Sequence, residues 1–182
     1  MKSARLALLL VRHAASIGAA VLALFMAEDR PSLAQAFSLD LDTYDGHFST
    51  WTMDKVGGAT TFVATIKASR VGHAKGWTPF VRFQVRTANA WQGLLVYAPT
   101  GDPPFQFFAV QGDIIHPKPQ DRFSGALNLN ESADIELSWE SKGTLMIHAA
   151  GGSRELPLAG PVLGLEVISG TAEFEVRDIQ IR

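Results

Sequence analysis

The chain has 182 residues, of which 47% are hydrophobic and 19% charged, and its formal net charge is −2. This composition is typical of a globular protein, and the lack of surplus positive charge excludes a general nucleic-acid binder, which neutralises phosphates with Lys and Arg. The chain has no cysteine, which excludes disulfides, thiolate metal sites and thiol nucleophiles.

The first 36 residues have the pattern of a secretory signal. Lys2 and Arg5 form a basic start, residues 14–27 form an apolar run, and Ala34 and Ala36 supply small side chains at the spacing of a cleavage site. The run has 14 residues, whereas a helix that spans a membrane needs about 20. We therefore predict a signal helix over 1–36 that is cleaved after Ala36, leaving no stable membrane anchor. The mature domain over 37–182 is expected in the periplasm or secreted.

After Ala36, short runs of alternating apolar and polar residues are separated by Gly, Pro, Asn and Asp. No stretch shows the sustained spacing of an amphipathic helix, so the pattern is typical of strands joined by turns. Strands are predicted over residues 37–42, 48–52, 60–69, 80–87, 93–97, 105–111, 114–116, 123–129, 133–140, 144–149, 154–158, 165–169 and 172–181. We predict one all-β domain, a two-sheet antiparallel β-sandwich.

The strand from Phe80 carries the candidate ligand-binding residues. Val81, Phe83 and Val85 alternate with polar side chains, which predicts one face in a core and one face away from it. Trp77 and Trp91 are predicted in the flanking loops. Flat rings beside planar hydrogen-bonding groups suit sugars, and paired guanidinium groups suit the carboxylates of an acidic polysaccharide. The predicted ligand-binding set is Trp77, Arg82, Gln84, Arg86 and Trp91.

Another interpretation of this set remains open. The tryptophans can cap the ends of the sandwich, and the arginines can pair with carboxylates on adjacent strands. In contrast, Trp51 and Trp139 alternate with polar neighbours, which predicts that they belong to the core.

The closing part of the chain resembles a known family of folds. Residues 134–139, 142–148, 164–167 and 170–181, with Gly170 followed by Phe174, Ile179 and Ile181, resemble the last strands of concanavalin A-like (laminin G-like) jelly rolls. The resemblance implies two curved antiparallel sheets, often with a ligand groove. It leads us to expect an exported glycan-binding or glycan-associated protein whose partner is a polysaccharide or oligosaccharide. The alternatives are a divergent glycoside hydrolase or polysaccharide lyase, and a structural or protein-interaction module.

The enzyme alternative depends on one acidic strand. Asp134, Glu136 and Glu140 share a face, with neighbouring positions about 6.6 Å apart, and paired carboxylates are the catalytic groups of glycosidases. The strand resembles the Glu-x-Asp-x-x-Glu strand of laminarinase-type hydrolases, but its order and final spacing differ. A solvated outer face of an antiparallel strand explains the same pattern, so we expect no catalytic site.

Asp40, Asp42 and Asp45 precede Gly46 in a pattern similar to a calcium loop. The EF-hand pattern requires a Glu six residues after its Gly, where this chain has Thr52. We expect no cofactor, with a calcium site of another kind on these oxygens as the alternative.

Overall fold

The computed structural model describes residues 36–43, 45–73, 75–112, 122–140 and 143–182. The predicted signal segment up to residue 35 and the predicted strand at 114–116 lie outside these ranges. The described residues form twelve strands and contain no α-helix, and therefore no helix that could cross a membrane.

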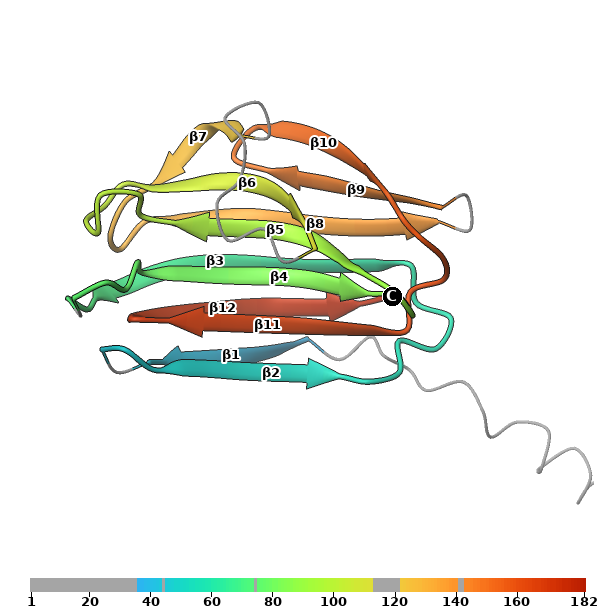
Figure 1. The fold of residues 1–182 in the computed structure, drawn as a ribbon, viewed down its shortest axis with the longest axis horizontal. Coiled ribbons are helices and arrows are strands. Elements are labelled where there is room, and N and C mark those ends of the chain that lie inside the picture. The colour runs from blue at the N-terminus through green and yellow to red at the C-terminus, as the bar shows by residue number, and fades with distance from the viewer. Residues whose placement is uncertain (1–35, 44, 74, 113–121, 141–142) are drawn as a thin grey trace, which may run out of the picture. The chain divides into compact units, whose positions relative to one another are not determined.

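The strands form two six-stranded sheets in which all neighbours are antiparallel (Figure 1). Sheet A contains, in spatial order, β1 (Phe37–Asp42), β12 (Ala172–Ile181), β3 (Thr61–Val71), β8 (Ser132–Glu140), β9 (Thr144–Ala149) and β10 (Gly152–Pro157). Sheet B contains β2 (Phe48–Met53), β11 (Gly164–Gly170), β4 (Phe80–Arg86), β5 (Trp91–Tyr97), β6 (Phe105–Gln111) and β7 (Arg122–Leu127). The predicted all-β antiparallel sandwich is confirmed.

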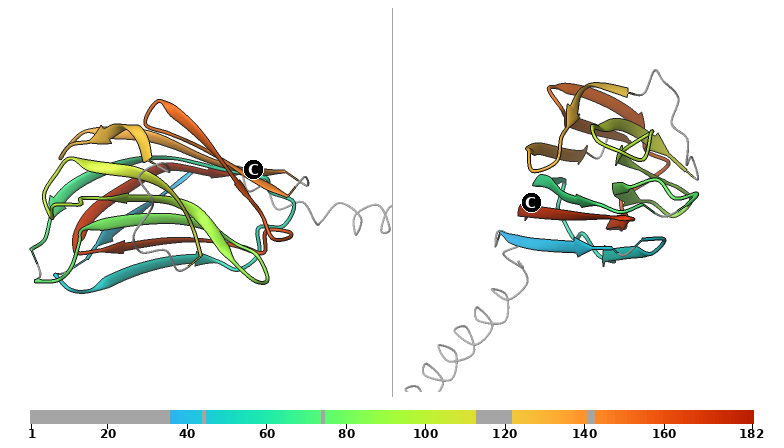
Figure 2. Two further views of the ribbon diagram at one scale, coloured as in Figure 1. Left: turned by 45° about the horizontal axis from the view of Figure 1, so that its top comes forward. Right: turned by 90° about the vertical axis from the view of Figure 1, so that its left-hand side faces the viewer.

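The core lies between the inner faces of the two curved layers, which Figure 2 shows from two further sides. Val81, Phe83 and Val85 are fully buried in it, as their alternation predicts. Rings from opposite sheets meet there: Phe62 and Phe83 have centroids 5.9 Å apart, and those of Phe105 and Phe174 are 5.1 Å apart. Each sheet therefore has one inner face in the core and one outer face.

One of the four tryptophans lies in a different element from the one predicted. Trp139 is buried in the core and its indole N–H donates to the carbonyl of Ala59 at 2.9 Å, which confirms its assignment. Trp91, predicted in a loop, is instead the first residue of β5. The reason is a tight reversal: the Thr87 N–H donates to the Ala90 carbonyl, and the Thr87 hydroxyl accepts from the Ala90 N–H. The connection therefore ends two residues earlier than predicted, at Ala90.

Candidate functional site

The outer face of sheet B holds a hollow of about 700 Å³, which we call the aromatic groove. This volume falls in the range of about 300–1,000 Å³ that is typical of small-molecule sites, which are mostly apolar with a few placed polar groups. It lies over strands β2, β11, β4 and β5 and the loop before β4. Its lining comprises Phe48, Thr50, Gly76, Trp77, Thr78, Phe80, Arg82, Leu95, Tyr97 and Ile168.

The strand register explains why these side chains meet. Residues that pair directly across neighbouring strands share a face, so two cross-strand rows supply most of the lining. One row runs from Thr50 through Ile168 and Arg82 to Leu95. The next row runs from Phe48 through Gly170 and Phe80 to Tyr97. The groove thus brings together residues that are far apart in the sequence, from Phe48 to Ile168.

Gly170 lies in the second row between the rings of Phe48 and Phe80, where there is no room for a side chain. A Cβ atom at this position would lie 2.6 Å from the Phe80 ring and 3.2 Å from the Phe48 ring. Because glycine has no side chain, these rings approach to 5.9 Å between centroids across it. Phe48 also packs edge-on against Trp77, with centroids 5.0 Å apart. The three rings form one continuous aromatic group.

The rings of this group remain accessible. Phe48 is 57% exposed and Trp77, in the loop before β4 as predicted, is 41% exposed. Beside them, Leu95, Phe108 and Val110 form a second apolar cluster with Phe80, Trp91 and Tyr97 packed against it. A large part of the outer face of sheet B is therefore also apolar, which the inner core alone does not require.

A polar group, which we call the Glu166 cluster, lies next to the groove and contains Asp54, Gln84, Arg86 and Glu166. The Gln84 side-chain amide donates to Glu166 Oε2 at 2.5 Å. Arg86 Nη2 donates to Asp54 Oδ1 at 2.9 Å, and Arg86 Nε lies 3.6 Å from Glu166 Oε1. Gly164 lies between the strand positions of Asp54 and Arg86, and the guanidinium reaches over it.

The structure thus splits the predicted ligand-binding set. Trp77 and Arg82 line the groove, whereas Gln84 and Arg86 belong to the Glu166 cluster. Trp91 stacks on Arg82, whose guanidinium carbon lies 4.3 Å from the ring centroid, an arrangement typical of a cation–π pair.

Sequence reasoning missed Phe48, Phe80, Tyr97 and Glu166. The uninterrupted apolar run in Gly93–Tyr97 is the signal that was available, because continuous apolar runs indicate strands covered on both faces.

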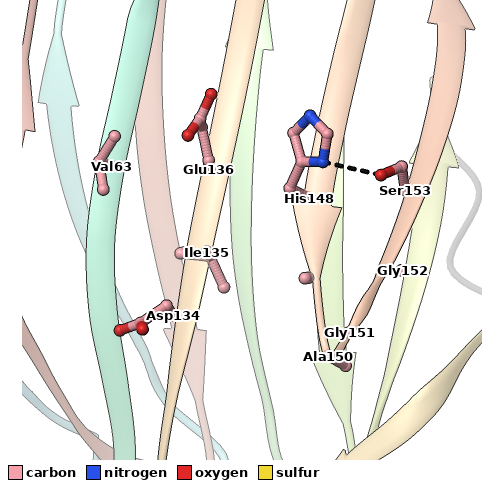
Figure 3. A pocket seen from close by; sticks show the side chains of 10 residues that line it. Val63, Asp134, Ile135, Glu136, His148, Ala150, Gly151, Gly152 and Ser153 are labelled. Carbon is pink, nitrogen blue, oxygen red and sulfur yellow. Dashed lines mark hydrogen bonds between the residues drawn. The ribbon is translucent and has the colours of Figure 1, made fainter.

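The outer face of sheet A carries a shallower hollow of about 420 Å³ (Figure 3). Asp134 and Glu136 line it from the same strand, and Asp134 accepts a hydrogen bond from the Thr65 hydroxyl at 2.8 Å. Across from Glu136, His148 Nδ1 lies 2.7 Å from the Ser153 hydroxyl. The two carboxylates are neighbours along β8 and do not face each other across the hollow. The side chain of Glu140 lies outside the described part of the structure.

The residues of the predicted calcium alternative, Asp40, Asp42 and Asp45, lie in different surroundings. Asp40 and Asp42 project from β1 into solvent, and Asp42 accepts from Arg70 at 2.8 Å. Asp45 lies in the following turn, with Oδ1 beside Gly72. Within the described ranges, no three His, Asp or Glu side chains gather closely enough to hold a metal ion.

Comparisons with known proteins identify the architecture. No protein-family model matches the sequence, and no curated protein matches it. Among solved structures, a polysaccharide lyase family 18 protein superposes with a TM-score of 0.53 at 10% identity, over 85% of this chain and 90% of that one. A galectin of Caenorhabditis elegans gives 0.48 at 11% identity, over 79% and 95%. The carbohydrate recognition domain of Emp47p gives 0.47 at 13%, over 85% and 90%.

At this low identity the similarity to the lyase establishes the fold and nothing finer. The chain has a jelly-roll sandwich fold of the concanavalin A-like type, as the closing strands indicate.

Proposed function

We propose that this chain is a carbohydrate-binding β-sandwich whose ligand lies in the aromatic groove. The apolar C–H face of a sugar ring stacks on an aromatic ring, while its hydroxyls need donors and acceptors at the ring edge. The groove offers both, because the hydroxyls of Thr50 and Thr78 and the guanidinium of Arg82 line it beside the rings.

One observation carries the proposal: Trp77 lies 41% exposed at this groove and is held edge-on by Phe48. Ordering a large flexible side chain on binding costs free energy, and a ring already fixed by its neighbour avoids part of that cost. Trp77 is therefore suited to act as a stacking platform.

The test is a screen of the purified protein against a panel of oligosaccharides, followed by titration calorimetry of the ligands found. Trp77→Ala is expected to weaken binding by about 1–3 kcal/mol, as loss of an aromatic anchor does, without unfolding the protein. Leu129→Ala is the matched control, since Leu129 is 39% exposed and lies outside the groove lining. Equal affinity of both variants for the same glycan would overturn the proposal.

We also propose that the chain is exported, on the basis of Lys2, Arg5, the apolar run at 14–27 and the small residues Ala34 and Ala36. N-terminal sequencing of protein recovered outside the cytoplasm is expected to begin at Phe37. Full-length chain recovered from the membrane fraction would instead establish a retained anchor.

A further inference from the structure

Charges of both signs lie around the aromatic groove. Among the described residues on the outer face of β2, β11, β4 and β5, the charged side chains are Arg82, Arg86 and Glu166, and Asp54 directly follows β2. Carboxylates therefore lie on this face together with the guanidinium groups. They weaken the attraction of this surface for a negatively charged polymer.

Arg86 has carboxylates at two of its nitrogens. Asp54 lies at Nη2 and Glu166 at Nε. The carboxylate of an acidic sugar that approached Arg86 would lie close to these two negative charges. Like charges in proximity disfavour each other's ionised form, so this approach is unfavourable.

The carboxylate of Glu166, in contrast, is a hydrogen-bond acceptor. An ionised carboxylate accepts hydrogen bonds at about four lone-pair positions and donates none. Gln84 supplies one donor to it. A sugar hydroxyl can supply another, whereas the carboxylate of a uronic acid cannot. The cluster therefore favours hydroxyl groups over acidic ones.

The cluster and the groove are close enough for one ligand. Glu166 is two residues from Ile168, and Gln84 is two residues from Arg82; both of these partners line the groove. Two residues along a strand span about 6.6 Å and return to the same face. A second sugar ring linked to one in the groove would therefore reach Glu166.

We infer that the ligand is a neutral glycan of at least two rings, with one ring in the aromatic groove and a hydroxyl of the next donating to Glu166. Glu166 is then the residue that discriminates neutral sugars from uronates. This inference rests on the proposed function, and it replaces the acidic polysaccharide expected from the two arginines alone.

The experiment compares neutral oligosaccharides with matched oligouronates on the full-length chain by titration calorimetry at low salt. Neutral ligands are expected to bind at least tenfold more tightly. Glu166→Gln keeps the shape of the side chain but removes its charge. This variant is expected to bind neutral oligosaccharides about tenfold more weakly, and its affinities for neutral oligosaccharides and for oligouronates are expected to differ less than those of the wild type. Glu136→Gln makes the same chemical change on the outer face of sheet A and is expected to change neither affinity.

A second variant keeps the test valid if Glu166→Gln disturbs the fold. Asp54 is 80% exposed, so Asp54→Asn leaves the core intact. Because it removes one carboxylate from Arg86, it is expected to improve uronate binding several-fold while neutral binding stays unchanged.

Each outcome separates the two proposals. Uronates that bind as tightly as neutral glycans, in a manner sensitive to Trp77→Ala, would overturn this inference and leave the proposed function standing. The same holds if neither Glu166→Gln nor Asp54→Asn changes the ratio. Absence of binding to both ligand classes would overturn the proposed function and this inference together.

Discussion

The outer faces of the two sheets differ although both cover the same core. On sheet A the outward side chains are mostly charged or polar, and several form pairs, such as Lys67 with Glu175 and Arg70 with Asp42. On sheet B they are largely aromatic and aliphatic, with the exposed rings of Phe48 and Trp77 among them. An antiparallel sheet needs only one apolar face to fold. The second apolar face of sheet B therefore points to binding.

The largest expected effect concerns the core that both sheets share. Phe83 is fully buried and packs against Phe62, so Phe83→Ala is expected to destabilise the protein by about 3–5 kcal/mol, as large core truncations do. Chemical denaturation of both proteins measures the difference. A loss below about 1 kcal/mol would mean that the inner and outer faces of β4 have been exchanged.

The next effect concerns the groove alone. Gly170→Ala places a methyl group against the rings of Phe80 and Phe48, which must move apart. We expect ligand affinity to fall about tenfold, or 1.4 kcal/mol, with a smaller change in stability. Gly58→Ala is the matched control, because a Cβ there meets no atom within 4 Å. Equal binding by the two variants would show that the spacing of the rings does not matter.

Sheet A is expected to tolerate the loss of a surface charge. Arg70 pairs with Asp42 and lies 3.4 Å from Glu173, yet its side chain is largely exposed. Exposed ion pairs contribute only about 0–1 kcal/mol. Arg70→Ala is therefore expected to lower stability by less than about 1 kcal/mol and to leave glycan binding unchanged. A clear loss of glycan binding would show that the binding surface lies on sheet A and not on sheet B.

The smallest effect is a dependence on pH. The hydrogen bond from Lys67, assisted by the charge of Arg177 and opposed by burial, holds the pKa of Glu175 below its ordinary value of 4.5. A lowered carboxyl pKa stabilises the fold above the unfolded value, and this stabilisation is lost as the pH falls through the folded value.

Thermal unfolding of the wild type and of Glu175→Gln measures this effect. The wild type is expected to have the higher Tm at pH 7, and the two values are expected to converge in acid. A difference that persists well below pH 4.5 would show that packing, and not charge, is responsible.

The sequence predicts the fold better than the site for a physical reason. Alternation is a local property, so Val81, Phe83 and Val85 could be assigned to the core from seven residues of β4. The groove depends instead on which strands become neighbours. Phe48 and Phe80 meet because β11 lies between β2 and β4 and presents Gly170 at their level. The pattern of apolar and polar residues within one strand does not show which strands become its neighbours.

The Glu166 cluster has the same origin. Arg82, Gln84 and Arg86 are visible as an outward face from sequence alone. The partners of Gln84 and Arg86, however, come from β11 and from the residue after β2. Trp91 was misplaced because the role of Thr87 in the turn before it is not evident in the spacing of apolar residues.

The strand order also determines when the molecule can fold. Among the described strands, β1 pairs only with β12, which also pairs with β3, and β2 pairs with β11. Pairings between distant parts of a chain form slowly, because closing a long loop costs conformational entropy before the stabilising contacts can form. Neither sheet can be completed until β11 and β12 have both been synthesised. The strands that precede them in the chain therefore wait for these two before either sheet is complete.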